Sequence, residues 1–402
     1  MRLLSLATLY PAPGRAGFGR FVQTQLETLA RQGEWDVTVI NPIGLPPLPQ
    51  FLCPAKYAPL RAIPLVETGV VTVHHPRFAL IPRLSGRFNP SLIVRAVLPL
   101  VRKLHAAAPF DMIDAQFFYP DGPAAADIAL ALNLPLAIKA RGSDILHWGA
   151  VPSARTQMLA AGVQASALLT VSQALGRDMM TMGLPGDRMR VHYTGLDHAR
   201  FYPRPRDEAR ATLATRLPAL DVPAGARMVV CVGNLIAIKG QALAIAAMSE
   251  LPDDVVLVLA GGGPDEAALQ AQVAAAGLGA RVLFAGALGH DDLPVLLSAA
   301  EAMVLPSERE GLANAWIEAI ASGTPIVITD VGGAREVVSS ASTGCVVDRT
   351  PAALAEGLRT VLDAKAPQDE VAAAAARFSW DSNAAELGSI YTEVVGRNTR
   401  ST

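Results

Sequence analysis

The segment from Leu305 to Glu336, LPSEREGLANAWIEAIASGTPIVITDVGGARE, constrains the fold more than any other stretch of the chain. Short apolar runs at 302–306 and 325–330 predict two buried parallel strands. Between them, Asn314 is a suitable helix N-cap and Gly323 a suitable helix end. The sequence therefore predicts a short helix that starts from a Gly-containing loop between two parallel strands.

Two carboxylates accompany this helix start: Glu310 lies on the loop and Glu318 in the first helical turns. Free backbone amides and a partial positive charge make such a helix start suitable for a phosphate. Because helical side chains lean toward the N-terminus, we expect Glu318 to reach back over that anion site. Carboxylates accept hydrogen bonds from sugar hydroxyls. From the spacing alone, two solvated glutamates remain an equal alternative.

Length and charge narrow the possible classes of protein. A chain of 402 residues predicts two domains, and a net charge of −2 gives no indication of nucleic-acid binding. The three cysteines lie far apart, so neither a zinc site nor a disulfide framework is expected, and a reducing cytoplasm fits best. No apolar run is long enough to span a bilayer. The first residues favour a strand over a signal peptide.

The N-terminal half opens with a strand at 3–8, a Gly-rich loop and a helix at 21–32. Gly17 and Gly19 in that loop would let the backbone come close to a ligand. The loop is not a dinucleotide fingerprint, because Val22 occupies the place of the third glycine.

Polar residues follow two further predicted strands of this half. Gln116 follows a strand that ends near Ala115, and Arg141 and Asp144 follow a strand at 136–139. Doubly wound sheets place ligands at the carboxyl ends of neighbouring strands. We therefore expect Gln116 and Arg141 to lie at a binding site. Asp144 has two open interpretations, a contact to the substrate or a helix cap.

Two other stretches of this half are unusual. Residues 42–64 are rich in proline and predict an irregular excursion over the surface. The stretch 83–103 carries five basic residues among aliphatic ones, namely Arg83, Arg87, Arg95, Arg102 and Lys103. One interpretation is an amphipathic helix on an anionic membrane. The favoured interpretation is a helix packed on the domain with its arginines in water.

The C-terminal half begins with a strand at 228–232 and the loop GNLIAIKG, which contains Lys239 but is not a Walker A motif. The charged, Pro-containing residues 204–223 before it are predicted to be a linker. Further on, the run HDD at 290–292 could hold a metal. We favour acids at a helix N-terminus there, since the chain has no DxD motif.

Together, Glu310, Gly311, Glu318 and the glycines Gly323, Gly332 and Gly333 resemble the donor-site signature of the retaining glycosyltransferases of family 4. The resemblance implies the GT-B fold, two Rossmann-like doubly wound α/β domains facing across a cleft. It places an acceptor-side domain at 1–203, a nucleotide-sugar-binding domain at 204–375, and at 376–402 a helix that crosses back to the first domain.

The resemblance also assigns roles to residues. The implied donor-binding set is Gly17, Asn234, Lys239, Glu310, Gly311, Leu312, Ala313, Asn314 and Glu318. The implied acceptor-side set is Gly19, Gln116, Arg141 and Asp144, and the implied catalytic set is Glu310, Lys239 and Arg141. No metal and no cofactor besides the donor are expected. Three positions depart from the family pattern: Asn234 replaces an arginine, and Gln116 and Arg141 replace histidines.

The implied activity is transfer of a sugar, with retention, from a UDP- or GDP-linked donor to a glycan or lipid-linked acceptor in polysaccharide or cell-envelope synthesis. The expected location is the cytoplasm, with an anionic membrane at the inner face of the cell as a further candidate partner. Two alternatives remain open, a GT-B nucleotide-sugar epimerase and a non-catalytic nucleotide-sugar-binding subunit. The sequence fixes neither the base, the sugar and the acceptor nor the oligomeric state.

Overall fold

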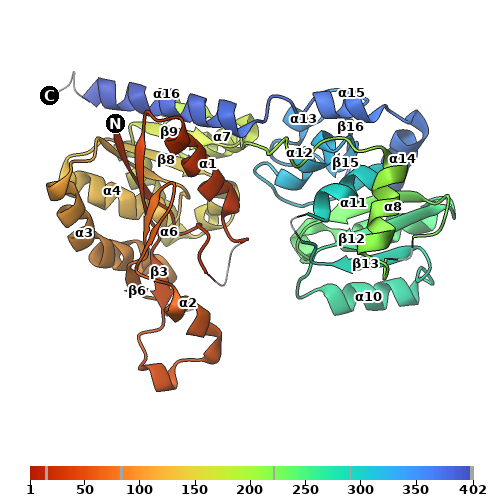
Figure 1. Ribbon diagram of the computed structural model, residues 1–402, viewed down its shortest axis with the longest axis horizontal. Coiled ribbons are helices and arrows are strands. Elements are labelled where there is room, and N and C mark those ends of the chain that lie inside the picture. Colours follow the sequence, from red (N-terminus) through yellow and green to blue (C-terminus); the bar gives the residue numbers. More distant parts are fainter. Residues whose placement is uncertain (14–16, 82–84, 221, 290, 399–402) are drawn as a thin grey trace. The chain divides into compact units, whose positions relative to one another are not determined.

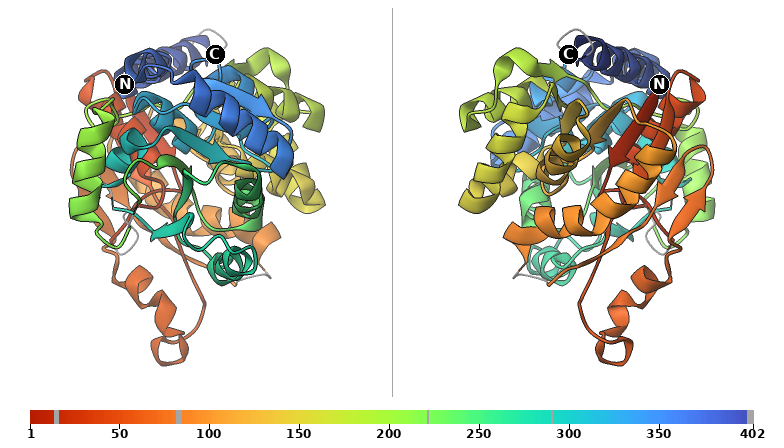
Figure 2. Two further views of the ribbon diagram at one scale, coloured as in Figure 1. Left: turned by 90° about the vertical axis from the view of Figure 1, so that its right-hand side faces the viewer. Right: turned by 90° about the vertical axis from the view of Figure 1, so that its left-hand side faces the viewer.

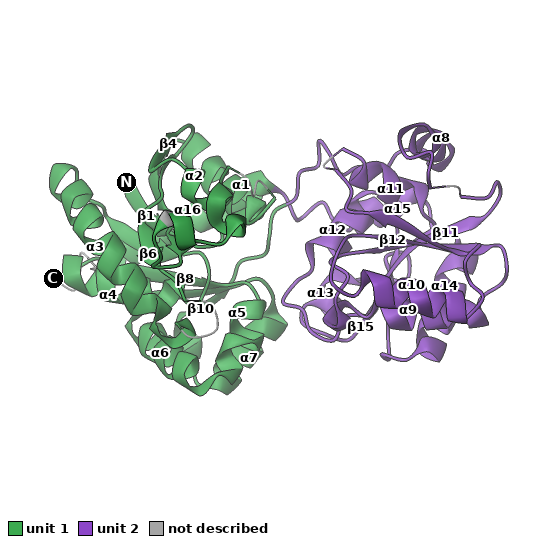
Figure 3. Cartoon of the chain, turned by 90° about the horizontal axis from the view of Figure 1, so that it is seen from below, with its two compact units in different colours: residues 1–195, 380–402 green, residues 196–379 purple. Residues whose placement is uncertain are grey.

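The computed structural model describes residues 1–13, 17–81, 85–220, 222–289 and 291–398. The chain forms two compact units (Figure 3): unit 1 contains residues 1–195 and the C-terminal segment from Trp380, and unit 2 contains residues 196–379. The predicted domain boundary after residue 203 lies eight residues beyond the first of these limits, and the one after residue 375 lies four residues before the second.

Unit 1 is built on a sheet whose strand order is β10-β9-β8-β7-β1-β2-β5-β4. All described pairs in it are parallel except the β4–β5 hairpin. The strands are β1 (Arg2–Leu6), β2 (Asp36–Ile40), β4 (Val66–Thr68), β5 (Thr72–His74), β7 (Met112–Ala115), β8 (Leu136–Ala140), β9 (Ala167–Thr170) and β10 (Met189–Val191). A separate parallel pair joins β3 (Ile43–Leu45) to β6 (Arg77–Ala79).

Helices cover both faces of this sheet (Figure 1). Helices α3, α4 and α6 contact one another in series, and α1 packs against α16. The helices of unit 1 are α1 (Arg20–Arg31), α2 (Ala58–Ala62), α3 (Asn89–Ala107), α4 (Asp121–Leu132), α5 (Ser143–Leu146), α6 (Pro152–Gln164), α7 (Gln173–Met182) and α16 (Trp380–Asn398). The Trp35 and Tyr391 rings meet edge to face at 5.8 Å, so the C-terminal helix shares the core of unit 1.

Unit 2 contains a wholly parallel sheet in the order β13-β12-β11-β14-β15-β16. Its four central strands are buried apolar runs, as expected where helices cover both faces (Figure 2, left), and the edge strands β13 and β16 are mostly half-buried. The strands are β11 (Arg227–Val232), β12 (Val255–Ala260), β13 (Val282–Gly286), β14 (Ala302–Leu305), β15 (Ile326–Thr329) and β16 (Gly344–Val347).

The helices of unit 2 form two contacting groups. Helices α8, α11, α12 and α15 contact in series, and α14 and α10 both contact α9. The helices are α8 (Arg206–Arg216), α9 (Gln241–Ala247), α10 (Glu266–Ala275), α11 (Leu293–Ala299), α12 (Asn314–Ala321), α13 (Ala334–Val337), α14 (Pro351–Ala364) and α15 (Gln368–Ala373).

The stretch predicted as a linker, 204–223, instead contains helix α8, so that prediction is wrong. Ala209 and Leu213 are buried one helical turn apart, and α8 packs on α11. The Arg210 guanidinium donates to the Glu301 carboxylate at 2.7 Å. The two apolar residues were not recognised as a helix face because charged residues surround them in the sequence, and Glu301, the partner of Arg210, is about ninety positions away.

Three local predictions are also corrected or resolved. Asn314 is the first residue of α12 and lies exposed, while Ala313 occupies the cap position, so the predicted N-cap is wrong by one residue. Residues 42–64 contain β3, two short 3-10 turns and α2. The basic stretch forms α3, which buries Ile93, Val97 and Val101 and leaves Arg95 exposed. Arg83 lies outside the described residues.

Candidate active site

The strand order of unit 2 has one reversal point, between β11 and β14. The chain proceeds outward from β11 through β12 and β13, and then returns to place β14 on the other side of β11. At such a point the loops that leave the two neighbouring strands separate and open a crevice for a ligand. Lys239 belongs to the loop after β11 and Glu310 to the loop after β14.

The structure brings these two predicted residues together. Lys239 Nζ lies 2.5 Å from Glu310 Oε1, and the Ser307 hydroxyl donates to the same carboxylate oxygen at 2.8 Å. The side chains are 21% and 12% exposed, so both remain open to a ligand while most of their surface is shielded from water. A cation and a hydroxyl-accepting carboxylate therefore stand side by side at the reversal point. Ser307 carried no sequence signal, because a loop serine is common.

Glycines allow the loops around Lys239 and Glu310 to pack backbone against backbone. Gly240 has a φ of +76°, and a Cβ there would lie 2.3 Å from the carbonyl oxygen of Pro306. Gly332 has a φ of +50°, and a Cβ there would lie 2.2 Å from the carbonyl oxygen of Glu310. The Gly333 amide donates to the Gly311 carbonyl at 2.9 Å. These contacts fix the loop that carries Glu310 between its two neighbours.

Helix α12 starts directly after this loop. Gly311, Leu312 and Ala313 are buried in the approach to it, and Asn314 is exposed at its first position. Glu318 lies on the second turn and is partly buried. Burial raises the pKa of the Glu318 carboxyl to about 7, while the positive charge of Arg200 opposes that rise. Arg200 belongs to no motif, so it could not be selected from the sequence.

Asn234, which replaces the family arginine, lies exposed on the loop after β11. Its backbone carbonyl accepts a hydrogen bond from Gln241 Nε2 at 2.9 Å. The carboxamide at this position has no charge, so Lys239 supplies the loop's cation. Among the predicted donor-binding residues, Gly17 belongs to unit 1, where it is exposed on the loop after β1.

Three of the predicted acceptor-side residues, Gln116, Arg141 and Asp144, form a connected cluster at the carboxyl ends of β7 and β8. Arg141 Nη2 donates to Gln116 Oε1 at 2.6 Å, and Arg141 Nε donates to the Gln116 carbonyl at 3.2 Å. The Arg141 guanidinium also lies over the Phe21 ring at 5.0 Å. Burial lowers the pKa of Arg141 to about 10, with Asp144 opposing, so the group stays charged at neutral pH. Gly19 closes the loop before α1 with a φ of +72°.

The carboxylate of Asp144 is used to hold these loops. It accepts the backbone amides of Phe118 at 2.8 Å, Gly142 at 2.8 Å and Arg141 at 3.0 Å. Asp144 is itself the second residue of α5, so it organises the turn before the helix from inside it. Burial raises the pKa of this carboxyl, and the backbone hydrogen bonds lower it.

Behind the acceptor-side cluster lie buried polar residues that sequence reasoning missed. Gln116 Nε2 donates to Asp114 Oδ2 at 2.5 Å, and the Tyr391 hydroxyl donates to the same oxygen. Asp114 reads as part of an apolar strand, and Tyr391 comes from α16, so no spacing could connect them. Burial raises the pKa of Asp114. The cluster thereby ties Gln116 to the C-terminal helix.

A second buried contact lies next to it. Lys139 Nζ lies 2.6 Å from His192 Nδ1 and donates to Gln25 Oε1 at 3.1 Å. Burial lowers the pKa values of both Lys139 and His192 well below their ordinary ranges. A neutral imidazole whose Nε2 proton goes to the Asn383 carbonyl at 2.9 Å can accept at Nδ1 from the lysine.

The described residues contain no group of three or more His, Cys, Asp and Glu side chains arranged to hold a metal ion. In the HDD run, Asp291 and Asp292 directly precede α11, with Asp292 at its cap position. His290 lies outside the described residues.

Family models match most of the chain in two parts. The model described as Glycosyltransferase Family 4 matches residues 15–200, and the model described as Glycosyl transferases group 1 matches residues 217–378. A GDP-mannose-dependent alpha-(1-6)-phosphatidylinositol monomannoside mannosyltransferase of Mycobacterium tuberculosis is 30% identical over 285 residues, which cover 64% of this chain and 72% of that protein. The chain belongs to glycosyltransferase family 4. It is a transferase, as the donor-site signature predicted.

Other relatives of this family 4 protein agree. The putative teichuronic acid biosynthesis glycosyltransferase TuaC of Bacillus subtilis is 26% identical, over 89% of this chain and 88% of that protein. Sucrose-phosphate synthase from Thermosynechococcus elongatus superposes with a TM-score of 0.79 at 21% identity, covering 99% of this chain and 100% of the other. Anabaena HepE in complex with UDP gives 0.75 at 20% identity, with 98% and 100% covered. These structures confirm the predicted GT-B fold.

None of the helices in the described part of the chain combines the length and the apolar character that a bilayer crossing requires.

Proposed function

We propose that this family 4 enzyme transfers a sugar, with retention, from a nucleotide-diphosphate sugar to a glycan or lipid-linked acceptor in cell-envelope or polysaccharide synthesis. The observation that carries the proposal is the Lys239–Glu310 pair at the reversal point of the unit 2 sheet. We assign Lys239 to the diphosphate, Glu310 to hydroxyls of the donor sugar and Glu318 to the ribose.

In this proposal the chemistry is electrostatic. Negative charge grows on the diphosphate as it leaves, and Lys239 and the amides of Gly311, Leu312 and Ala313 stabilise it. Glu310 currently neutralises Lys239, so binding of the donor replaces one anionic partner of the ammonium with another. That exchange lets Glu310 turn to the sugar at the moment when the phosphate takes the lysine. No metal takes part in this scheme.

On the acceptor side, we assign the acceptor contact to Arg141, with Gln116 and Asp144 holding the guanidinium and its loop. A charged guanidinium at the carboxyl ends of β7 and β8 suits an acceptor that carries a phosphate or carboxylate group. The donors of two similar proteins differ, because HepE was crystallised with UDP while the mycobacterial relative is GDP-mannose-dependent. We propose a UDP- or GDP-linked donor on that basis, and action in the cytoplasm.

The first test measures nucleotide binding. UDP, GDP and ADP, with their common sugar conjugates, are added to the wild type and to Lys239→Ala, and the melting temperature is followed. We expect one nucleotide family to stabilise the wild type and not the variant. Absence of any shift would contradict the assigned donor site. Product from the identified donor, analysed for anomeric configuration, then separates retaining transfer from epimerisation.

A further inference from the structure

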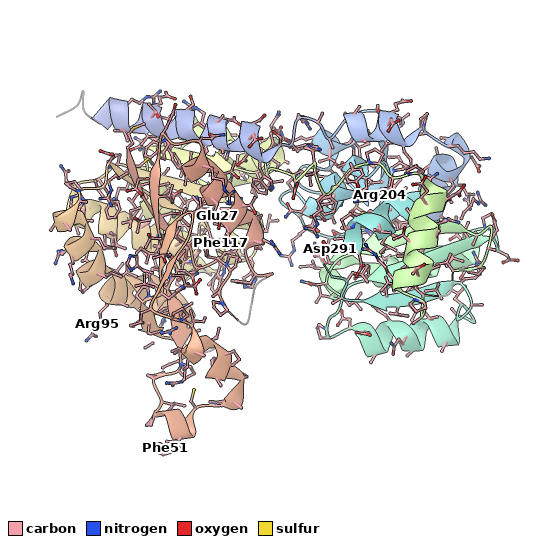
Figure 4. The ribbon with its side chains drawn as sticks, in the orientation of Figure 1. Glu27, Phe51, Arg95, Phe117, Arg204 and Asp291 are labelled. Atoms are coloured by element: carbon pink, nitrogen blue, oxygen red, sulfur yellow. The ribbon has the colours of Figure 1, made fainter. Side chains whose placement is uncertain are left out.

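Residues 46–66 project from the body of unit 1 as a finger (Figure 1). They contain the two 3-10 turns, at Gln50–Leu52 and Ala55–Tyr57, followed by α2. Phe51 lies at the end of the finger (Figure 4) and is 85% exposed, and the neighbouring Leu52 is 59% exposed. Two adjacent large apolar side chains that are exposed to water indicate an interaction site.

The finger is a folded element and not a frayed loop. At its base, Arg77 Nη1 donates to the Leu60 carbonyl at 2.9 Å, and its other terminal nitrogen donates to the Ile63 carbonyl. Within the finger, Arg61 Nη2 donates to the Leu48 carbonyl at 3.0 Å. Ile63 is buried in a small core cluster with Ile43. These contacts hold the base closed, so the apolar tip is presented by the fold.

Exposed apolar residues gather around this end of unit 1. Of the fourteen large hydrophobic side chains exposed among the described residues, eight lie between positions 48 and 88. The finger contributes Leu65 at 65% exposed, and the start of α3 contributes Phe88 at 49%. The rest of unit 1 contributes five such residues, among them Leu130 on α4.

The charge around the finger is strongly basic. Residues 41–110 contain eight Lys and Arg residues and one acidic residue, whereas the rest of the chain contains twenty-six basic and thirty-five acidic residues. On α3, Arg95 and Arg102 are exposed and seven residues apart, so they share the face opposite the buried stripe of Ile93 and Val97. Figure 4 shows Arg95 on the same side of unit 1 as the finger.

We propose that this end of unit 1 docks on an anionic lipid bilayer, with Phe51 and Leu52 entering the headgroup region and Arg95 and Arg102 contacting lipid phosphates. Exposed apolar side chains at a tip, in a stretch of the chain with eight basic residues and one acidic residue, supply the hydrophobic and the electrostatic contributions that hold peripheral proteins on anionic membranes. Lipids rearrange around an irregular finger, whereas a protein partner would need a surface shaped to it.

Vesicle flotation tests the docking. We expect the wild type to float with phosphatidylcholine vesicles that contain phosphatidylglycerol and to remain unbound with phosphatidylcholine alone. Phe51→Ser/Leu52→Ser should abolish flotation, while the matched pair Leu130→Ser/Val163→Ser should leave it unchanged, since both replaced residues are also exposed. Arg95→Gln/Arg102→Gln should weaken binding about thirtyfold, at about fivefold for each charge, and Arg177→Gln on α7 should not.

Cys53 gives a direct probe of insertion, since this free thiol lies two residues from Phe51 and is partly exposed. With Cys345→Ser in place and Cys231 buried, an environment-sensitive dye on Cys53 should shift to the blue on anionic vesicles. Lipids that carry a nitroxide group should quench the fluorescence of this dye.

Three results would overturn the proposal: a wild type that does not float, equal losses in the matched controls, or a concentration-dependent dimer abolished by Phe51→Ser, which would make the finger an interface between copies. This proposal rests on the proposed function in one respect, the lipid-linked acceptor. Lipid binding needs no nucleotide and no acceptor. Failure here would leave the nucleotide-induced melting shift intact, and failure of the nucleotide test would leave flotation intact.

Discussion

The contact between Lys239 and Glu310 predicts opposite effects on nucleotide affinity when one or the other residue is replaced. Replacing Lys239 with alanine removes the cation assigned to the diphosphate and leaves Glu310 with the Ser307 hydroxyl as a donor. A hydrogen bond between charged groups contributes about 1.5–3 kcal/mol. We therefore expect Lys239→Ala to weaken binding of the nucleoside diphosphate by about 10-fold to 150-fold.

The same substitution should also cost stability. The distance between Lys239 Nζ and Glu310 Oε1 is 2.5 Å, and the two side chains are 21% and 12% exposed. This partial exposure to water places the net contribution of the pair at or below the lower end of that range, about 1–2 kcal/mol. For a unit of this size, such a loss lowers the melting temperature by a few degrees. Thermal unfolding without ligand measures it.

Replacing Glu310 with glutamine should act differently. The neutral amide no longer competes with the diphosphate for the Lys239 ammonium, so nucleotide affinity should stay the same or rise. Turnover should fall strongly, because the carboxylate that accepts sugar hydroxyls is lost. Isothermal titration with nucleotide, together with a transfer assay, separates the two effects.

Arg309→Ala is the control, because Arg309 carries the same charge as Lys239, belongs to the loop of Glu310 and lies exposed beside Glu308. It should change neither affinity nor turnover by more than a few-fold. Equal loss of nucleotide affinity in Lys239→Ala and Glu310→Gln would refute the exchange of partners. So would an undiminished affinity in Lys239→Ala.

Three further predictions concern buried groups. Glu318, with a pKa of about 7, should bind ribose more tightly as the pH rises from 6 to 8, and Glu318→Gln should weaken nucleotide binding and remove that pH dependence in titrations. Burial also raises the pKa of Asp121 to about 7, so its stabilising protonated form is fully present below the ordinary carboxyl pKa and is lost as the pH rises through 7. Asp121→Asn should flatten the pH dependence of unfolding by up to about 4 kcal/mol; an unchanged slope would contradict it. Tyr391→Phe should destabilise unit 1 by about 1–3 kcal/mol and raise the acceptor KM at unchanged nucleotide affinity, since it leaves buried Asp114 short of a donor.

The donor loop was predictable because its information is local. The strands around the helix, the Gly stops and the two glutamates all lie within one short stretch, and β14, α12 and β15 form there. The sequence also indicated that Lys239 and Glu310 follow two different strands. Their contact then depends on β11 and β14 being neighbours, which is a property of the whole sheet.

The missed features depend on partners distant along the chain. The sequence of helix α8 resembles a linker because its charged residues have no stabilising partners nearby in the chain. The helix is stabilised by Glu301 and by packing on α11. Asp114 and Tyr391 are 277 positions apart, and only the packing of α16 on unit 1 brings them together. A tyrosine in a C-terminal helix carries no signal for that contact.

The structure connects two of the three departures from the family pattern. Gln116 and Arg141 stand where histidines are usual, and here the carboxamide oxygen of one accepts from the guanidinium of the other at 2.6 Å. Gln116 accepts this hydrogen bond and a second one from Gln25 Nε2 through its carboxamide oxygen, and it donates to Asp114 through its nitrogen. A histidine at this position could not make all three hydrogen bonds. The two replacements therefore form one unit: changing either alone leaves a buried group unsatisfied. Gln116→His/Arg141→His should accordingly unfold at a higher temperature than either single variant, and a strictly additive pair of losses in a double-mutant cycle would show that the two positions act independently.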